Sequence, residues 1–528
     1  MRTIRVLAAG LALALLGSPA PADDTPVKSK IVGVDLFKNG LAIVKREATL
    51  GRAGTYTIDD VPTPVHGTFY IDSTGTVDVA VRMRDVEVPA TETVPGNLQD
   101  DLAGKKVVVH FRGDKRAPVA GTMMKIKPPR ADEQAAAGRF LVLQTAKGRV
   151  YLEPSEVMAV ESEDAGTTVT RRRPQLALTL AETDKAETKV TIRYIATGLS
   201  WAPSYRLDIS DPKTLALEQN AVVRNELADL DGAEVRLISG YPSVQYAHVR
   251  SLISPRATFA SFFAELAGGR SWEADAASNS IVSQQAVSLN LRAPGGGWGG
   301  SNLALGATPA GEGVDLHYQS IGKRTLAAGD ALALTVARGK AEYERIVEWL
   351  VPDTRNAHGQ PEGNGEGDVW DALKFKNPLA FPMTTGPATV TANGQFNGQR
   401  TSYWVNSGEE TVLHVEKALS VRTRATETEQ LNKDGSGRDL IWLGGRQYRK
   451  TTVEGELAVS NHRKETIALV IRRRFSGELV QADGDPKRQL REEGVYSVNK
   501  RQEMLWTLPL KGGEEKKLKY TYTVLMPH

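Results

Sequence analysis

The stretch KVTIRYIATGLSWAPSYRLDI, residues 189–209, holds two runs of alternating apolar and polar side chains. The first run covers residues 189–196 and the second covers residues 204–209, with one glycine and one proline between them. Alternation with a period of two is typical of strands that have one buried face. The stretch therefore predicts two consecutive β-strands and, with them, a fold built from sheets.

The segment GLSWAPSY joins these two runs. Gly198 can adopt a positive φ and Pro203 lacks the backbone donor of a sheet ladder, so we expect the chain to bend between the strands. Trp201 at this bend, with Tyr194 and Tyr205 on either side, would fix its angle by burial, which contributes about 2–3 kcal/mol for an aromatic side chain. The alternative is an exposed aromatic pair that stacks on a sugar ring. We favour the structural corner.

The same pattern recurs near the carboxyl terminus in MLWTLPLKGGEEKKLKYTYTVL, residues 504–525. Apolar residues, among them Trp506, occupy alternate positions on both sides of a Lys-Gly-Gly turn, which predicts a β-hairpin. Many further short segments of this kind are separated by Gly, Asn and Asp. Together they predict a mainly β, multidomain protein with β-sandwich-like domains, a small SH3-like barrel and a short inserted helix.

Changes in strand spacing and composition divide the chain into three segments. An N-terminal β domain over residues 28–98 opens with two strands around a Lys-Asn-Gly turn at 38–40. Residues 101–163 read as a string of short strands with tight glycine turns, which suits a small SH3-like barrel. The main β-sandwich-type region covers residues 174–528 and carries an insertion over residues 252–314.

The insertion contains a short helix signal. Ser254 is the expected N-cap and Pro255 the first helical residue. Phe259, Phe262 and Phe263 then fall on one helix face, followed by a stretch rich in Gly, Ala and Ser. We expect this face to pack onto the protein's own sheet, and the alternative is that these three residues contact a partner.

The amino terminus indicates a compartment. Residues 1–22 have a positively charged start, an apolar stretch and an Ala-Pro-Ala end, which together predict a cleaved signal peptide. No other stretch is long and apolar enough to predict a membrane span. The chain has no cysteine, so disulfides and cysteine-ligated metals are excluded. We expect a periplasmic or secreted protein of a bacterial envelope.

The overall charge points to no nucleic-acid partner. The chain has 66 basic and 63 acidic residues, a net charge of +3. Its two basic clusters, at residues 171–173 and 472–474, are interpreted as solvated strand ends. A nucleic-acid surface would need a basic stripe with base-stacking groups, and none is evident.

No catalytic constellation is recognisable, and we predict no catalytic residue, no metal and no cofactor. The eight histidines are scattered, and nucleophile-elbow, zinc-protease and phosphate-loop motifs are missing. Two loops rich in acidic, Asn and Gly residues, NKDGSGRD at 432–439 and PDTRNAHGQPEGNGEGD at 352–368, offer oxygen ligands for calcium. Both are better interpreted as hairpin loops that use these residues for backbone reasons.

The segment 174–528 resembles the mucoidy inhibitor A-like family of exported bacterial proteins, whose main domain has no known function. The resemblance rests on Tyr194, Gly198, Ser200, Trp201, Pro203 and Tyr205, and on the stretches 373–390, 456–475 and 505–524. Many family members carry a long coiled coil between their two domains, whereas this chain has the barrel-like segment 101–163. The resemblance implies a fold and a compartment but no reaction.

These observations favour an envelope protein that binds or scaffolds without catalysis, with an envelope protein or polysaccharide as its partner. The alternative is a hydrolase or lyase that acts on envelope polysaccharide, for which paired carboxylates roughly 5–9.5 Å apart in an aromatic-lined cleft would be required. A third hypothesis is an assembly component that pairs through an exposed β-edge.

Overall fold

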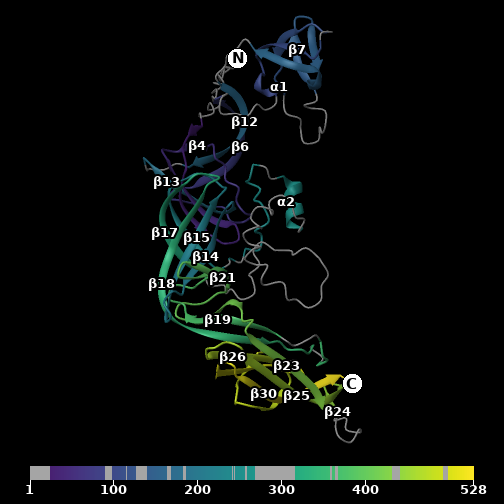
Figure 1. Ribbon diagram of the computed structural model, residues 1–528. Helices are drawn as coiled ribbons and strands as arrows, with labels where there is room; N and C mark the ends of the chain where they lie inside the picture. The colour runs from purple at the N-terminus through teal and green to yellow at the C-terminus, as the bar shows by residue number, and fades with distance from the viewer. Residues whose placement is uncertain are drawn as a thin grey trace, which may run out of the picture. The chain divides into compact units, whose positions relative to one another are not determined.

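The computed structural model shows a mainly β protein with several separate sheets (Figure 1), which confirms the predicted fold class. The chain forms two compact units, each made of more than one segment. Within the described residues, the first unit takes 24–33, 44–196 and 248–267, and the second takes 34–43, 197–247 and 316–527. The structure describes residues 24–89, 98–113, 116–126, 140–162, 168–181, 186–240, 242, 244–255, 258–267, 316–356, 359–362, 367–430, 440–491 and 498–527.

The first unit contains a four-stranded sheet in which two long strands pair along their whole length. Its strand order is β1–β4–β12–β6, and Leu176, Leu178 and Leu180 at the end of β12 are buried in the core. The first unit also pairs β13 with β5. The bounds are β1 (Thr25–Pro26), β4 (Gly54–Ile58), β5 (Tyr70–Ser73), β6 (Val77–Pro89), β12 (Thr168–Leu180) and β13 (Thr188–Thr197).

A second sheet of the first unit is formed by five short antiparallel strands. The order is β10–β9–β8–β7–β11, so the last strand of this segment returns to pair with its first strand. Apolar side chains from four of the strands, Val109, Met123 and Leu143 among them, form one small core. The elements are α1 (Leu98–Asp101), β7 (Lys106–Phe111), β8 (Val119–Met123), β9 (Leu141–Thr145), β10 (Gly148–Leu152), a 3-10 turn at Pro154–Glu156, and β11 (Val157–Ser162).

The two strands expected around the turn at 38–40 are present. They are β2 (Lys30–Leu36) and β3 (Leu41–Leu50), which are hydrogen-bonded neighbours. The tip of this hairpin, residues 34–43, belongs to the second unit. Lys38 is fully buried there, and its ammonium group donates to the Thr384 hydroxyl at 2.5 Å.

The second unit is organised around one unusually long strand, β18 (Ala331–Val351). The first half of β18 pairs with β15, and the second half pairs with β19 and β26. Tyr205, Leu217, Phe375 and other buried residues form an apolar core beneath the first half. The strands of this part are β14 (Leu199–Asp208), β15 (Thr214–Asn225), β16 (Leu230–Ser239), β17 (His317–Leu326), β19 (Asp368–Lys376), β20 (Gly386–Ala392), β21 (Gln395–Ser402) and β22 (Glu410–Lys417).

The break between β13 and β14 is at Gly198, as expected from the sequence, but Pro203, which was also expected to interrupt the ladder, does not break the strand. Gly198 has a φ of 106°, whereas β14 runs unbroken through Pro203, which lies opposite Ala221 of β15. A Cβ on Gly386 of β20 would meet the Pro203 carbonyl oxygen at 2.9 Å, so the backbone groups of this proline face β20. The pairing of β14 with β20 starts only at Tyr205, and the sheet therefore needs no donor from the proline.

We expect Gly198→Ala to lower the free energy of unfolding by about 1–3 kcal/mol, because only glycine adopts this φ without strain. A Cβ at this position would also touch Leu227 at 3.4 Å. Gly408→Ala is the matched control, since its φ of 73° is closer to the left-handed well and its Cβ would meet open space. Urea unfolding that gives equal losses for the two variants would contradict the strain argument.

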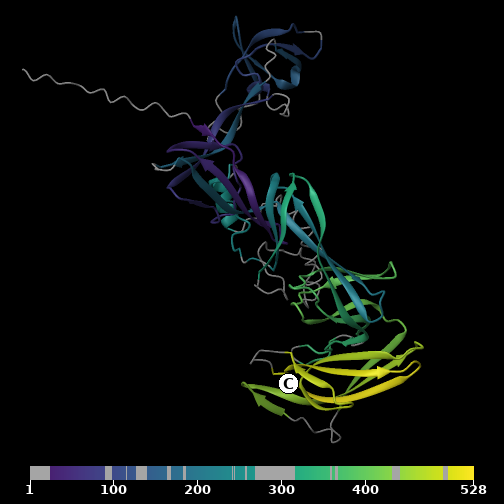
Figure 2. The ribbon, with the colours of Figure 1, turned by 90° about the vertical axis from the view of Figure 1, so that its left-hand side faces the viewer.

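The carboxyl-terminal part of the second unit is a β-sandwich, whose strands form two layers (Figure 2). Buried residues of both layers, including Trp349, Leu457, Trp506 and Tyr522, form a single core. One layer contains β23, β24, β25, β27 and β30, and the other contains the end of β18 with β26, β28 and β29. The bounds are β23 (Val421–Gln430), β24 (Leu440–Leu443), β25 (Arg446–Asn461), β26 (Ile467–Ser476), β27 (Glu478–Ala482), β28 (Lys487–Leu490), β29 (Arg501–Leu510) and β30 (Glu515–Pro527).

The hairpin predicted for residues 504–525 is wrong, although both of its strands are present. β29 pairs with β26 and β28, whereas β30 pairs with β25 and β27, so the two strands lie in different layers. Their apolar faces meet across the shared core. The turn between β29 and β30 packs against the turn between β25 and β26. A Cβ on Gly512 would lie 2.4 Å from the Lys464 carbonyl oxygen. The side-chain amide of Asn461 donates to the Leu510 and Lys511 carbonyls.

The insertion helix α2 (Phe259–Leu266) begins later than predicted. Its N-cap is Thr258, which forms a capping box with Ser261. Ser254 instead lies in a turn in which its N–H bonds the Ser251 carbonyl at 2.9 Å. In this capping box the Thr258 hydroxyl accepts from the Ser261 N–H, and the Ser261 hydroxyl accepts from the Thr258 N–H. Two backbone donors at the helix start are satisfied at once, which explains why the helix begins after Thr258. No helix among the described residues is long and apolar enough to cross a bilayer.

Candidate functional site

The aromatic residues singled out in the sequence are all buried. The indole of Trp201 donates to the Ile238 carbonyl at 3.1 Å, and the Tyr205 hydroxyl donates to the Thr384 carbonyl at 2.8 Å. Trp506 donates in the same way to Asp483, at 2.7 Å. Tyr194 is buried in the first unit, and its burial raises the pKa of its hydroxyl above the ordinary value. These side chains have no exposed ring face on which a sugar would stack.

The three phenylalanines of α2 are divided between the core and the solvent. Phe262 is buried and meets the His66 ring edge-on at a centroid distance of 4.9 Å. Phe259 and Phe263 are 70% and 61% exposed and stack on each other at 6.3 Å. Glu265 anchors the helix through a two-pronged contact with Arg250, at 2.8 and 3.1 Å.

The arginines at 472–474 are not solvated strand ends, contrary to the sequence interpretation. They lie within β26, and alternation places Arg473 on the core face, where it is 1% exposed. Its guanidinium donates to Glu427 at 2.5 Å and to the Tyr520 hydroxyl at 2.8 Å. The Tyr520 and Tyr522 hydroxyls also donate to the Glu427 carboxylate, at 2.7 and 3.2 Å.

Burial and hydrogen bonds fix the protonation states of this cluster. Burial alone would raise the pKa of Glu427, but the charge and hydrogen bonds of Arg473 and a hydrogen bond from Tyr520 hold it below its ordinary value. Burial raises the pKa of both tyrosines well above the ordinary value. Glu427 thus stays a carboxylate and the phenols stay neutral, which is the state that the hydrogen bonds require.

A second polar cluster lies on the outer side of β18, around Glu348. His414 and Arg472 contact its carboxylate at 2.6 and 2.5 Å, and Trp370 stacks on the His414 ring at 5.3 Å. Burial raises the pKa of Glu348, but the hydrogen bonds from His414 and Arg472 outweigh it and hold the pKa below its ordinary value. A general acid for glycoside cleavage needs a raised pKa, so this carboxylate is unsuited to that role.

Only part of the two loops considered for calcium lies within the described residues. The loop at 432–439 lies outside the described residues. In the loop at 352–368, Asp353 accepts hydrogen bonds from Arg355 and Ser476, and Asn356 accepts from Gln360. No group of three acidic, histidine or cysteine residues suited to a metal occurs in the part of the chain that is described.

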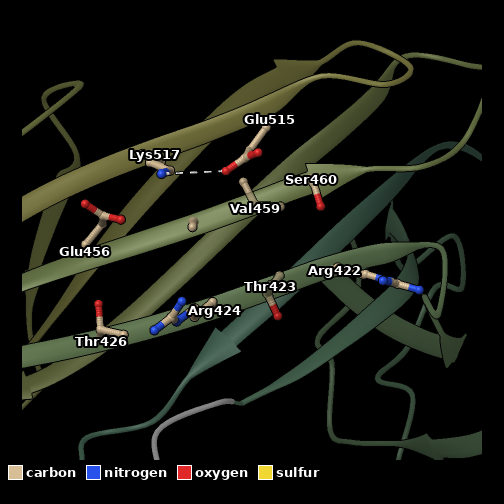
Figure 3. A pocket seen from close by; sticks show the side chains of 10 residues that line it. Arg422, Thr423, Arg424, Thr426, Glu456, Val459, Ser460, Glu515 and Lys517 are labelled. Atoms are coloured by element: carbon tan, nitrogen blue, oxygen red, sulfur yellow. Dashed lines mark ion pairs between the residues drawn. The ribbon is translucent and has the colours of Figure 1, made fainter.

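The clearest candidate binding site is a hollow of about 360 Å³ on the outer face of the C-terminal sheet (Figure 3). Three neighbouring strands, β23, β25 and β30, supply its walls and floor. The floor is low because Ala458 lies directly between Arg424 of β23 and Lys517 of β30. The residues around the hollow are Arg422, Thr423, Arg424, Thr426, Glu456, Ala458, Val459, Ser460, Glu515 and Lys517.

The cations of this hollow are available to a ligand. Within the described part of the chain, neither Arg422 nor Arg424 has a carboxylate within ion-pair distance, and both are exposed. Lys517 is 3.9 Å from Glu515, a long contact (Figure 3). Arg422 and Arg424 are two residues apart on one strand, so they lie about 7 Å from each other on the same face.

The sequence interpretation missed this hollow. Its only local signal is the run from Val421 to Gln430, in which Arg422 and Arg424 are spaced for the same face of a strand. The small floor residue Ala458 and the third cation Lys517 come from strands further along the chain. Only strand pairing brings the three together, and no periodicity predicts that pairing.

Comparison with known protein families places these observations in context. Residues 190–528 match the family model described as a domain of unknown function, DUF4139. The matched segment includes the hollow and the clusters around Glu427 and Glu348. A comparison with curated proteins finds no match. Because the matched segment makes up more than half of the chain, this protein belongs to the DUF4139 family.

Proposed function

We propose that this protein is a non-enzymatic binding protein of the bacterial envelope, and that it holds an acidic polysaccharide in the hollow on its C-terminal sheet. The observation that carries the proposal is the pair Arg422 and Arg424, two guanidinium groups at the rim of a polar hollow that have no carboxylate partner among the described residues (Figure 3). Guanidinium binds carboxylate in a bidentate manner, with charge-assisted hydrogen bonds that are stronger than neutral ones.

The shape of the hollow supports an extended sugar ligand. The three cations of the hollow are about 7 Å apart along the strand and about 10 Å apart across the strands. This spacing of Arg422, Arg424 and Lys517 is larger than the width of a single carboxylate. Thr426 and Ser460 add hydroxyl groups at the same surface. No aromatic side chain lines the hollow, so the stacking platform of single-stranded nucleic-acid sites is missing from it.

The envelope location and the finer family assignment are part of the same proposal. The signal-peptide pattern of residues 1–22 supports export. The resemblance of residues 174–528 to the mucoidy inhibitor A-like family supports an envelope role. The buried carboxylates Glu348 and Glu427 both have a lowered pKa, whereas the general acid of a glycoside hydrolase needs a raised one, so neither of the two supports the hydrolase alternative.

Titration with an oligouronate at low ionic strength tests the proposal. We expect measurable affinity that falls with added salt, and an Arg422→Gln/Arg424→Gln double variant that binds at least about tenfold more weakly. Arg338→Gln is the matched control, because this arginine is exposed on β18 and pairs with Glu218 at 2.8 Å. Neutral dextran is the ligand control. Equal weakening in both variants, or no binding at low salt, would overturn the assignment.

A further inference from the structure

The tip of the β24–β25 hairpin presents four consecutive apolar side chains that are exposed to solvent. β24 pairs with the start of β25 around a Gly444-Gly445 turn in which both glycines have positive φ. The pairing of β25 with β30 begins only at Tyr448, so the last residues of the tip are two-stranded. The four residues of β24 are exposed by 37% (Leu440), 36% (Ile441), 70% (Trp442) and 47% (Leu443).

The apolar residues of the tip occupy both faces of the strand. Successive side chains of a strand point to opposite faces, so Leu440 and Trp442 lie on one face, and Ile441 and Leu443 on the other. None of the four belongs to the core of the sandwich. An antiparallel strand with one face on its own domain normally presents a polar face to water, and a flat protein surface would cover only one face of the tip. A strand apolar on both faces suits an environment that surrounds it.

The partner strand supplies positive charge beside these apolar groups. Arg446 pairs in register with Leu443, and Arg449 with Leu440. Lys450 follows, and no acidic residue occurs between Leu440 and Lys450. Within the described residues, none of these three cations forms an ion pair with a carboxylate. Tyr448 adds a second aromatic ring with a polar end, opposite Ile441.

We propose that this hairpin tip inserts into the interfacial region of an anionic phospholipid bilayer. Leucine, isoleucine and tryptophan enter the boundary between headgroups and acyl chains, where tryptophan and tyrosine are enriched in membrane proteins. Arg446, Arg449 and Lys450 remain at the level of the lipid phosphates, where each basic residue adds to the attraction. Among the described residues the outer edge of β24 has no strand partner, and such unpaired backbone groups limit insertion to the hydrated interface.

Vesicle flotation with the mature full-length chain tests this proposal. We expect binding to vesicles of phosphatidylcholine mixed with phosphatidylglycerol, and weak binding to phosphatidylcholine alone. Trp442→Ser/Leu443→Ser should bind at least about tenfold more weakly, and Arg446→Gln/Arg449→Gln should lose the preference for the anionic lipid. Phe396→Ser is the matched control, since Phe396 is 68% exposed on β21 of the same unit.

Each other outcome contradicts the proposal. Displacement by soluble glycerol phosphate would show that the headgroup alone is recognised and that no insertion takes place. Flotation that is absent at low ionic strength, or equal in the tip and Phe396 variants, would remove the lipid assignment. Sedimentation velocity that shows a Trp442-dependent dimer without vesicle binding would identify the tip as a contact between copies of the chain. Trp442, Leu443 and Arg446 are exposed and Arg449 is half-buried, and unchanged thermal unfolding verifies that the variants are folded.

Discussion

Glu427→Gln is expected to lower the free energy of unfolding of the C-terminal sandwich by about 3–5 kcal/mol, the usual effect of removing one partner from a buried ion pair. Arg473 would then keep its charge in a site where it is 1% exposed. The glutamine has nearly the same shape, so the loss comes from charge and not from a cavity. Tyr520 and Tyr522 would also lose the anion to which they donate.

The contribution of Glu427 should depend on pH in one direction. Its pKa in the folded protein is below the ordinary value of 4.5, so its stabilising effect is complete above pH 4.5 and disappears as the pH falls through the folded-state pKa. The stabilities of the wild type and of Glu427→Gln should therefore converge in acid and differ most near neutral pH.

Hydrogen exchange of the β25 and β30 amides under increasing urea measures this effect locally, which avoids a two-state assumption for a chain with two units. Glu456→Gln is the matched control, because Glu456 lies on the same sheet but on its outer face. The control should change the stability by less than about 0.5 kcal/mol. An equally small change for Glu427→Gln would show that the buried pair contributes little.

Trp201→Ala is expected to cost about 3–5 kcal/mol, since it leaves a large cavity in a close-packed site. Trp201→Phe retains most of the packing but leaves the Ile238 carbonyl oxygen without the indole donor at 3.1 Å. Its expected cost is about 1–3 kcal/mol, the penalty for a buried unsatisfied group. Hydrogen exchange of the β14 and β16 amides gives both values.

Phe396→Ala serves as the control for the tryptophan series, because the ring is exposed and its removal should change stability by no more than about 0.5 kcal/mol. Comparable losses for Trp201→Ala and Phe396→Ala would mean that the motif residue is not a determinant of stability. Such equal losses of stability are expected for a tryptophan whose only role is to stack on a sugar.

The sequence predicts which faces of the strands are buried but not which strands pair. The alternating residues of 504–510 and 518–524 are indeed inward-facing, yet their strands belong to opposite layers. Periodicity reports the environment of each strand separately, whereas pairing depends on distant partners. Gly512, which packs against Lys464, was interpreted as a hairpin glycine. The same turn residues occur whether a turn joins two paired strands of one sheet or two strands of different layers.

Charged residues were the least predictable part of both candidate sites. Arg473 lies between two other arginines, and its neighbours along the chain give no sign of the carboxylate that it contacts. That carboxylate, Glu427, lies 46 residues earlier. A buried charge is tolerated only when a partner is folded against it. A sequence that contains 63 acidic residues does not indicate which one is that partner.

The division of the second unit between residues 34–43 and the region after residue 197 has a consequence for synthesis. Lys38 meets its partner Thr384 only after 346 more residues have been added. At the usual translation speed of about 5–20 residues per second, this takes roughly 20–70 s. During that interval Lys38 lacks the Thr384 hydroxyl and the Thr385 carbonyl to which it donates in the folded chain. The earliest part of this unit to leave the ribosome is thus among the last to complete its buried polar contacts.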